Sequence, residues 1–475
     1  MTDPADLGVA EASALLADGT LSASELVRAC LARIRDHDGK HSHEGDPASI
    51  NAWVRVYEED ALAAAAQADE RRSAGGVGRQ GEPPLLCGIP VGLKDLFAVA
   101  GKPLTASSSL LDETPERDCD VWARLAAQGM VLLGHVHTHE FAVGGTTDQV
   151  GNPWALGRSA GGSSGGSAAA LAARMVPAAT GTDTAGSLRI PSAICGTSTI
   201  KPTRGLVSMA GIVPLAPSLD HAGPMARSLA DCALLLAAMA GPDRGRPASA
   251  LLRHPAGRPL VRSRLDGIRL AVSPRVEKVR LDPDVADGFD AALAELRRLG
   301  AALVEVPPPA LALNLGDDYL DVLYAELLVY HRRFDDRRHL YRPSLREWVE
   351  EGEQRATSGE AYAAAQTRRR EITAGWEDWF AEHRVTALVE PTVPVVAPLR
   401  GDGYDHARSD VALLLLTHYW NWTGFPAVAL PAGVGSRSGL PVGVSLIGPA
   451  GTDLELLSVG IALQGNLGVA APGAA

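Results

Sequence analysis

The sequence predicts an α/β protein, in which strands and helices alternate along the chain. Short apolar runs that resemble buried strands alternate along the chain with alanine-rich or amphipathic stretches of helical spacing. Alternation of this kind is typical of α/β folds. The chain has 475 residues, 46% of them hydrophobic and 21% charged, which is enough for a large globular core.

The N-terminal part is predicted to be largely helical. Ser22 and Glu25 form a capping box ahead of apolar residues at helical spacing. Residues 37–49 are polar and contain a proline, which predicts a loop. A short strand is then expected over Asn51–Tyr57 and a second helix over Glu58–Arg72.

The middle of the chain is expected to supply the central sheet. The apolar run Ile89–Leu93 predicts a strand that ends on the charged pair Lys94 and Asp95. The elements expected next are a helix over Cys119–Ala127, a strand over Val131–Leu133, a loop over Gly161–Ser167, a helix over Ala168–Arg174 and a loop over Gly181–Ser187.

The C-terminal part repeats the alternation after a connecting segment, residues 242–265, that is rich in Arg, Pro and Gly. Long polar helices are expected within residues 316–383, and Gly468–Ala475 is expected to fray. The other expected elements are strands over Gly267–Val272, Leu303–Val306, Val385–Glu390, Ala427–Leu430 and Val442–Ile447, and an amphipathic helix over Asp284–Leu299.

Charge and cysteine content narrow the class of protein. The net charge is −12 without a long basic run, which argues against a nucleic-acid binder. Five scattered cysteines without a CxxC pair predict no disulfide framework and favour a reducing compartment. No signal-peptide pattern and no apolar run of membrane-spanning length is seen, so we predict a cytoplasmic protein that does not enter a membrane.

The first glycine-rich loop, Gly161–Ser167, has several interpretations. Such loops ahead of a helix can bind a phosphate, but the lysine of a P-loop is missing and the spacing is not GxGxxG. A flexible linker is the plain alternative.

The second loop, Gly181–Ser187, leads directly to a serine through small residues. Such a loop can bring consecutive backbone N–H groups close to a substrate oxygen and stabilise an oxyanion. A simple glycine turn is the alternative. A serine nucleophile needs a base, and Lys94 could serve if burial keeps it neutral. Taken alone, that lysine is more typical of a structural ion pair, for example with Asp95.

Together these segments resemble the amidase signature family. Gly161 to Pro191 fits the long Gly/Ser signature of that family, and Pro90–Asp95 resembles its lysine motif. The resemblance extends over about residues 5–465. Further matches are Cys195-Gly196, Lys201–Gly205, Asp220–Pro224, Thr423–Pro426 and Leu440–Gly443.

The resemblance implies one α/β/α body around a large mixed sheet, hence a single amidase domain over residues 1–475. Its parts would be an N-terminal helical segment (5–70), a catalytic core (85–240) and a C-terminal part that shapes the substrate pocket (266–465).

It also implies a Ser–Ser–Lys triad. Ser187 matches the nucleophile, Ser163 the bridging serine on a cis peptide bond, and Lys94 the base. The backbone N–H groups of Thr184, Ala185, Gly186 and Ser187 would bind the oxyanion, although Ala185 stands where many members have glycine. Val143 and Gly144 match the acyl wall, and neither a metal nor another cofactor is implied.

The histidines at 135, 137 and 139 form an HxHxH pattern that on a strand could bind zinc. The resemblance instead places them at a strand end or in a substrate wall. His137 and His139 stand where amidotransferase subunits usually have Asn and Asp, which favours a different role.

The predicted function is therefore hydrolysis of the C–N bond of a small amide, aryl or alkyl, with carbamates or esters as side activities. The alternatives are the glutaminase (A) subunit of a tRNA-dependent amidotransferase, an inactive scaffold of the same fold and a nucleotide-binding protein. The expected partner is a small-molecule amide, without nucleic acid or membrane, and a homo-oligomer is left open. Aromatic residues that could line the pocket are Tyr319, Tyr324, Tyr330, Tyr404, Tyr419, Trp420 and Trp422.

Overall fold

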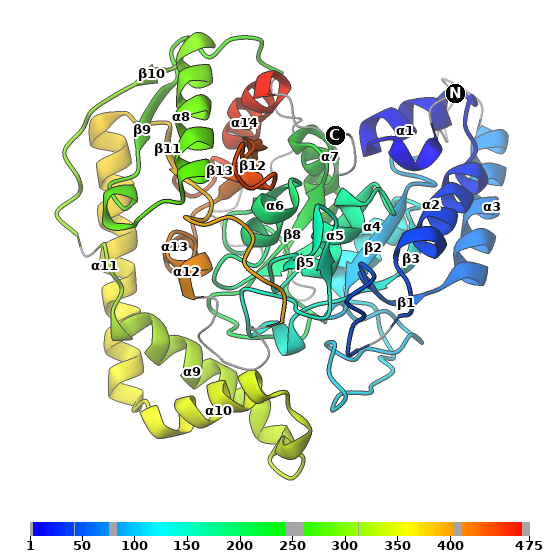
Figure 1. The fold of residues 1–475 in the computed structure, drawn as a ribbon, viewed down its shortest axis with the longest axis horizontal. Coiled ribbons are helices and arrows are strands. Elements are labelled where there is room, and N and C mark those ends of the chain that lie inside the picture. The colour runs from blue at the N-terminus through cyan, green and yellow to red at the C-terminus, as the bar shows by residue number, and fades with distance from the viewer. Residues whose placement is uncertain are drawn as a thin grey trace.

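The computed structural model describes residues 3–41, 43–75, 83–242, 261–311, 313–401 and 411–467. They form one mixed sheet of eleven strands with helices on both faces, as the family resemblance implies (Figure 1). Most of the predicted connecting segment, Tyr404 and the C-terminal tail lie outside the described residues. No helix in the described ranges is long and apolar enough to cross a membrane.

The order of the strands determines where the two glycine-rich loops meet. Strand β2 pairs in parallel with both β3 and β6, whereas β6 pairs antiparallel with β8. Because parallel strands end at the same edge of a sheet, the residues at the ends of β2 and β6 lie close together. Across the sheet the strands are β1 (Trp53–Val56), β3 (Val131–Val136), β2 (Pro90–Lys94), β6 (Ala178–Asp183), β8 (His221–Ala226), β7 (Ser198–Lys201), β12 (Ala427–Val434), β13 (Pro441–Ile447), β11 (Ala387–Pro391), β9 (Arg269–Val272) and β10 (Ala302–Leu303).

Helices α6 (Arg189–Cys195) and α8 (Pro283–Arg298) lie on opposite faces of the sheet. Val442 and Gly443 are neighbours on β13 and so point to opposite sides. A Cβ on Gly288 of α8 would meet Val442, and a Cβ on Gly443 would meet Ala193 of α6. The sheet is therefore covered on both sides.

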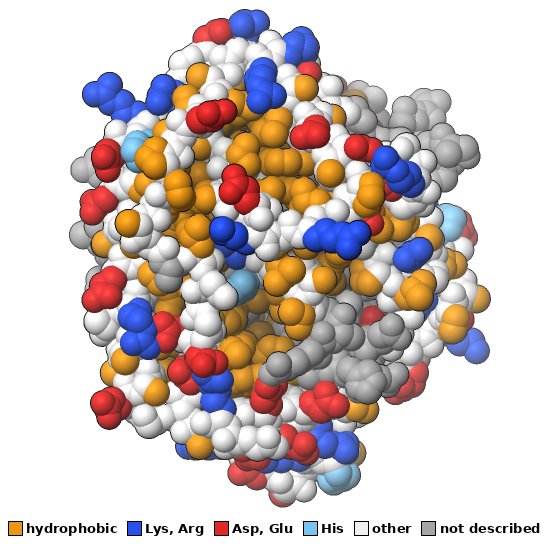
Figure 2. All heavy atoms as spheres, turned by 60° about the vertical axis from the view of Figure 1, so that its left-hand side comes forward, with side chains coloured by type: hydrophobic (Ala, Val, Ile, Leu, Met, Phe, Trp, Pro, Cys, Tyr) orange, Lys and Arg blue, Asp and Glu red, His pale blue; other side chains and the backbone are white. Residues whose placement is uncertain are grey.

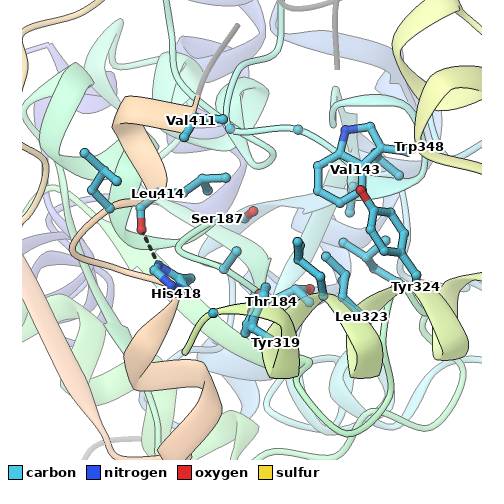
Figure 3. Close-up of a pocket in the computed structure, with 18 residues that line it drawn as sticks. Val143, Thr184, Ser187, Tyr319, Leu323, Tyr324, Trp348, Val411, Leu414 and His418 are labelled. Atoms are coloured by element: carbon cyan, nitrogen blue, oxygen red, sulfur yellow. Dashed lines mark hydrogen bonds between the residues drawn. The ribbon is translucent and has the colours of Figure 1, made fainter. Parts of the chain in front are cut away.

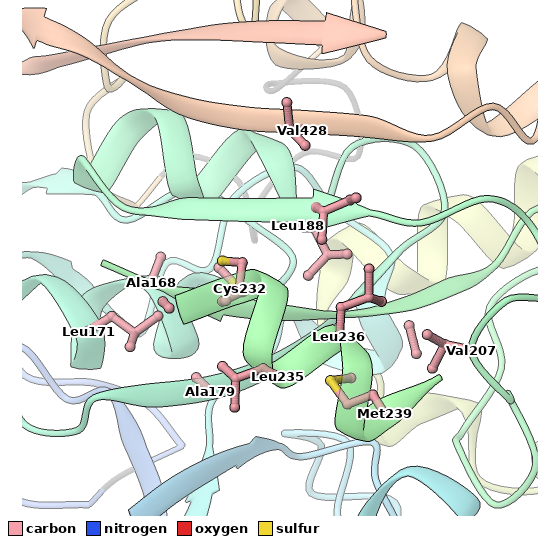
Figure 4. Packing of buried hydrophobic residues seen from close by; sticks show 14 of the residues in the cluster. Ala168, Leu171, Ala179, Leu188, Val207, Cys232, Leu235, Leu236, Met239 and Val428 are labelled. Carbon is pink, nitrogen blue, oxygen red and sulfur yellow. The ribbon is translucent and has the colours of Figure 1, made fainter. Parts of the chain in front are cut away.

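The remaining covering helices pack by small and aliphatic residues. Helix α5 (Gly165–Ala172) contacts β6, β8 and α6. Helices α7 (Leu229–Met239) and α14 (Asp453–Leu467) contact each other, and α14 also contacts α8. Buried side chains of α7, among them Leu235, Leu236 and Met239, pack in the core beside the central strands (Figure 4).

The N-terminal helices pack at the β1 end of the sheet. Helix α2 (Ala23–His37) starts with the predicted capping box, because Ser22 Oγ accepts from Glu25 N and Glu25 Oε2 accepts from Ser22 N at 2.8 Å. Helix α3 (Glu58–Gly75) contacts α2 and β3, whereas α1 (Val9–Ala17) and α4 (Asp120–Ala127) contact α7. Strands β4 (Gly151–Asn152) and β5 (Ala155–Ser159) pair in a separate two-stranded sheet.

Three long helices extend from the sheet on the other side. Helix α9 (Asp317–His331) packs against both α10 (Pro343–Arg355) and α11 (Gly359–His383) (Figure 1). Two short helices, α12 (Val411–Leu414) and α13 (Tyr419–Thr423), follow later in the chain. Figure 2 turns this side of the molecule towards the viewer and shows broad groups of hydrophobic side chains between scattered charged ones.

Candidate active site

Lys94 is fully buried at the end of β2 among three hydroxyl groups. Its Nζ lies 2.8 Å from Ser163 Oγ, 2.9 Å from Ser164 Oγ and 2.8 Å from Thr182 Oγ1. Burial lowers the pKa of Lys94 well below its usual value, and the negative charges of Asp183 and Asp220 only partly oppose this. The amine is therefore suited to be neutral and to accept a proton.

The plain alternative for Lys94, an ion pair with Asp95, is wrong. The Asp95 carboxylate instead accepts from the backbone N–H groups of Thr105 and Ser107, at 3.2 and 2.8 Å, and from the Thr105 hydroxyl. Asp95 thus holds the loop that follows β2, and Lys94 faces the serines.

Ser163 lies in the turn that precedes α5. The Gly162–Ser163 peptide bond is cis. The Ser163 carbonyl accepts from His139 N at 3.0 Å and from Thr147 Oγ1 at 3.2 Å, and these two hydrogen bonds hold the backbone of the turn in place. Gly162 is required here, because a Cβ would lie 2.1 Å from the Thr146 carbonyl oxygen.

Ser187 is the last residue of the second loop, just ahead of α6. Its side chain is almost completely buried, lines a cavity and has no hydrogen-bond partner within the described part of the chain. The Ser187 carbonyl accepts from Ser164 N at 3.3 Å, so the two glycine-rich loops are in direct contact. The structure thus brings Lys94 and Ser163 into hydrogen-bond contact and places Ser187 on the adjacent loop. The side-chain hydroxyls of Ser163 and Ser187 are not hydrogen-bonded to each other.

The backbone between β6 and α6 exposes unused donors. Among the described residues, the N–H groups of Thr184, Ala185, Gly186 and Ser187 have no hydrogen-bond acceptor. Buried N–H groups are rarely left without a partner. Four in a row beside Ser187 make this loop a candidate site for a negatively charged oxygen.

The cavity in front of Ser187 has a volume of about 260 Å³ and a mostly apolar wall (Figure 3). Val143 and Gly144 are among the residues that line it. No Asp, Glu, Lys or Arg lines it among the described residues. The other lining residues are Ala142, Gly145, Thr184, Ala185, Leu215, Gly316, Tyr319, Leu320, Leu323, Tyr324, Trp348, Val411, Leu414, Leu415 and His418.

Of the aromatic residues singled out from the sequence, Tyr319 and Tyr324 line the cavity. Tyr419, Trp420 and Trp422 are fully buried and belong to the hydrophobic core, and Tyr330 packs against Phe141 at its edge.

Trp348 and His418 also line the cavity and were missed by the sequence prediction. Trp348 stands on a polar helix and His418 follows a leucine run, so neither carries a local signal. Burial lowers the pKa of His418 to about 4, and its Nδ1 lies 2.7 Å from the Leu414 carbonyl. His418 is therefore neutral at physiological pH.

The HxHxH histidines lie behind the cavity wall and do not line it. His135 Nε2 lies 3.0 Å from Phe97 O, and His137 Nδ1 lies 3.1 Å from Ser107 Oγ. His139 Nδ1 contacts Thr146 O, and a Cβ on Gly144 would collide with the His139 ring. Within the described ranges no group of three or more His, Cys, Asp or Glu residues could hold a metal ion.

The chain matches the family model described as Amidase over residues 25–457. It is 37% identical to the A subunit of glutamyl-tRNA(Gln) amidotransferase from Ralstonia nicotianae over 95% of this chain and 96% of the relative. The corresponding protein of Chloroflexus aggregans is also 37% identical, with 98% and 97% covered. A solved chain from a vestigial protein complex, described as revealing the origins of an s-triazine catabolic enzyme, superposes with a TM-score of 0.85 at 31% identity, covering 97% of this chain and 98% of that one.

These relatives contradict the main functional prediction and the predicted partners. Both relatives are named as the A subunit of a glutamyl-tRNA(Gln) amidotransferase. The prediction was a stand-alone hydrolase of small aryl or alkyl amides that does not contact nucleic acid. The prediction rested on His137 and His139, which stand where amidotransferase subunits usually have Asn and Asp. Neither residue lines the cavity in front of Ser187, so neither is positioned to contact a substrate there directly.

The family itself is established by the extent of these matches. The family model spans residues 25–457, and both relatives are covered almost end to end. The chain belongs to the amidase family of amide hydrolases.

Proposed function

We propose that the chain cleaves an amide through an acyl-enzyme on Ser187, with Lys94 as the base and Ser163 as the relay between them. The contact that carries this proposal is the 2.8 Å approach of Lys94 Nζ to Ser163 Oγ in a fully buried setting. A buried neutral amine is a competent base, whereas a protonated one is not.

The hydrogen bonds around Lys94 support this direction of proton flow. Ser164 Oγ donates to Thr182 O at 3.3 Å, so it accepts from Lys94. A neutral amine has two N–H donors and one lone pair. The lone pair is then left for the hydroxyl proton of Ser163 or of Thr182, and Ser163 is the one on the loop that contacts Ser187.

In the proposed reaction Ser187 Oγ attacks the amide carbon while its proton passes to Ser163 Oγ and the Ser163 proton passes to Lys94. The protonated relay then gives a proton to the leaving nitrogen as the C–N bond breaks. Water enters, is activated by the same relay, and releases the acid. The two hydroxyls would come into contact once substrate fills the cavity, since catalytic hydrogen bonds often tighten only in the complex.

The N–H groups of Thr184, Ala185 and Gly186, with that of Ser187, would receive the oxyanion. Backbone donors that already point at the developing charge need no reorganisation during the reaction. Ala185 supplies an N–H as glycine would, so the departure from the usual glycine leaves the site intact.

For the substrate we propose the side-chain amide of glutamine, with the chain acting as the ammonia-releasing glutaminase of a tRNA-dependent amidotransferase. The support is the near full-length similarity, at 37% identity, to proteins that carry the amidotransferase name. The role requires partner chains that pass the ammonia on to a glutamyl-tRNA.

The apolar lining of the cavity favours one orientation for this proposed substrate. Its described wall is apolar and uncharged, which suits the two methylene groups of glutamine but not its ammonium or carboxylate. We therefore propose that the amide enters first, towards Ser187, while the charged end stays at the mouth. Val143 and Gly144 would contact the methylene groups.

The test is to incubate wild type and Ser187→Ala with glutamine and hydroxylamine and to measure ammonia and γ-glutamyl hydroxamate. Wild type should form both products and the variant neither. An anilide and an aliphatic amide are run beside glutamine. Turnover of those amides without any glutamine turnover would overturn the glutamine proposal.

A further inference from the structure

Three consecutive carbonyl groups of the loop before Ser187 accept hydrogen bonds from side chains of the C-terminal half of the chain. Asp183 O accepts from Asn421 Nδ2 at 2.8 Å, and Thr184 O accepts from Tyr319 Oη at 2.9 Å. Ala185 O accepts from Thr417 Oγ1. Three consecutive carbonyls are thus held by three separate donors.

These bonds also determine where the N–H groups of the loop point. In a trans peptide unit the C=O of one residue and the N–H of the next are antiparallel. Tyr319, by holding Thr184 O, directs the N–H of Ala185 the opposite way, and Thr417 does the same for the N–H of Gly186. Neither N–H has an acceptor within the described residues, so both remain available to a ligand.

A bond to the carbonyl also strengthens the N–H of the same peptide unit, because hydrogen bonds in a chain polarise one another. The low polarity around the loop increases this effect. Tyr319 is buried, with its ring edge-on to His418 at 5.1 Å between centroids, and Thr417 is 1% exposed.

We propose that Tyr319 and Thr417 are positioning residues, whose hydroxyl groups aim the N–H groups of Ala185 and Gly186 at the oxyanion. The inference rests on the proposed role of this loop as the oxyanion site. It goes further in assigning the orientation of the loop to two side chains of the C-terminal half.

Both hydroxyls are well suited to this task. Burial raises the pKa of the Tyr319 phenol, so it stays a neutral donor at any physiological pH. Thr417 Oγ1 lies closer to Ala185 O than to Leu414 O, which is 3.3 Å away. A Cβ on Gly186 would lie 2.3 Å from Thr417 Oγ1, so the two residues are in direct contact.

The two roles of Tyr319 can be separated by substitution. Its ring lines the cavity, whereas its hydroxyl holds the loop. Tyr319→Phe keeps the ring and removes only the hydroxyl, and Thr417→Val keeps the shape of threonine. Each change should slow the chemical step and leave binding in the cavity nearly unchanged.

The experiment uses an alkyl fluorophosphonate, which needs no knowledge of the natural substrate. Ser187 Oγ forms a bond to phosphorus, fluoride leaves, the hydroxyl proton passes to the relay, and charge builds on the phosphoryl oxygen. We measure the maximal inactivation rate and the half-saturating probe concentration separately. Since loss of a whole oxyanion donor costs about 10²–10³-fold, a misdirected one should slow inactivation by about 10-fold or more.

Matched controls and a rescue distinguish positioning from general damage. Tyr362→Phe and Thr373→Val lose hydroxyls that bond to Glu326 and to the Arg369 carbonyl, away from the loop, and should inactivate like wild type. Thr417→Ser restores the hydroxyl and should recover most of the rate. Thermal unfolding is measured for every variant to compare their folding.

Slow inactivation in Tyr319→Phe and Thr417→Val, with an unchanged half-saturating concentration and rescue by Thr417→Ser, supports the proposal. Wild-type inactivation rates in both variants would overturn it, as would equal slowing in Thr417→Val and Thr417→Ser. A wild-type enzyme that reacts with the probe but does not cleave glutamine would refute the glutamine assignment alone.

Discussion

Asp183 and Arg189 form a completely buried two-point ion pair that closes the loop carrying Ser187. Arg189 Nε lies 2.9 Å from Asp183 Oδ2 and Arg189 Nη2 lies 3.0 Å from Asp183 Oδ1. Asn421 bonds to both residues of the pair. Burial alone would raise the pKa of Asp183, but the charge of Arg189 holds it below its usual range. The loop is therefore anchored at both ends by charge.

Replacing Arg189 with methionine should destabilise the protein strongly, because it leaves the Asp183 charge buried without its partner. The expected loss is about 3–5 kcal/mol in the free energy of unfolding, measured by urea denaturation. Arg298→Met is the matched control, since its ion pair with Glu295 lies at the surface, where water screens it, and should contribute little to stability. Equal effects of the two substitutions would contradict this account of the pair.

Lys94→Met should abolish the acid limb of the pH–rate profile together with most of the activity. In wild type the rate should fall as the pH drops through the lowered pKa of Lys94, because the protonated amine cannot accept a proton. Loss of the base should slow fluorophosphonate inactivation by about 10²–10⁴-fold. A variant with near wild-type rate would exclude Lys94 as the base.

The same substitution should change how stability depends on pH. The pKa of Lys94 in the native protein lies below the value of about 10.4 for a lysine in an unfolded chain. At a pH between these two pKa values, Lys94 is protonated in the unfolded chain and neutral in the native protein. Wild type should therefore gain stability as the pH rises through that window. Lys94→Met should lack this contribution, and parallel stability–pH curves for the two proteins would contradict it.

Two glycine-to-alanine substitutions should change stability in opposite directions. A Cβ on Gly166 would lie 2.5 Å from His137 N and 2.6 Å from Ala52 O, which are both rigid backbone atoms. Gly166→Ala should cost about 1–3 kcal/mol or more. Gly465 on α14 has nothing within 4 Å of a Cβ, so Gly465→Ala should stabilise by up to about 1 kcal/mol, as judged by thermal unfolding.

Thiol reagents should leave the native protein unmodified. The free cysteines at 30, 87, 119, 195 and 232 are all buried, and burial raises the pKa of Cys30 and Cys119 to about 12. An Ellman titration should detect no reactive thiol before denaturation and five after it. Rapid loss of activity on treatment with N-ethylmaleimide would contradict a serine-based site.

The sequence predicted an α/β protein and the strands whose residues are large and apolar, and its resemblance to the amidase signature family implied the α/β/α architecture. It did not predict β6, β7 and β8 as strands, because their segments are rich in small and polar residues. In β6, a Cβ on Gly181 would lie 2.6 Å from Leu188 Cδ2, so close packing demands glycine where strand propensity would favour a larger residue. Tertiary packing decides these strands, and local sequence does not carry that signal.

The candidate site divides in the same way. Lys94, Ser163 and Ser187 stand in motifs that could be compared with a family, whereas Thr417 and His418 reach the site only through contacts that form in the folded chain. No spacing in the sequence relates Thr417 to Ala185.

The hydrogen bonds from Tyr319 and Thr417 also bear on biosynthesis. A chain leaving the ribosome contains Lys94, Ser163 and Ser187 long before Thr417 has been made, with a delay on the order of ten seconds or more at ~5–20 residues per second. Until the C-terminal segment docks, the loop carbonyls lack their donors and the cavity lacks one wall. The nascent protein would thus lack the donors that hold this loop until Thr417 has left the ribosome, whatever the state of Lys94, Ser163 and Ser187.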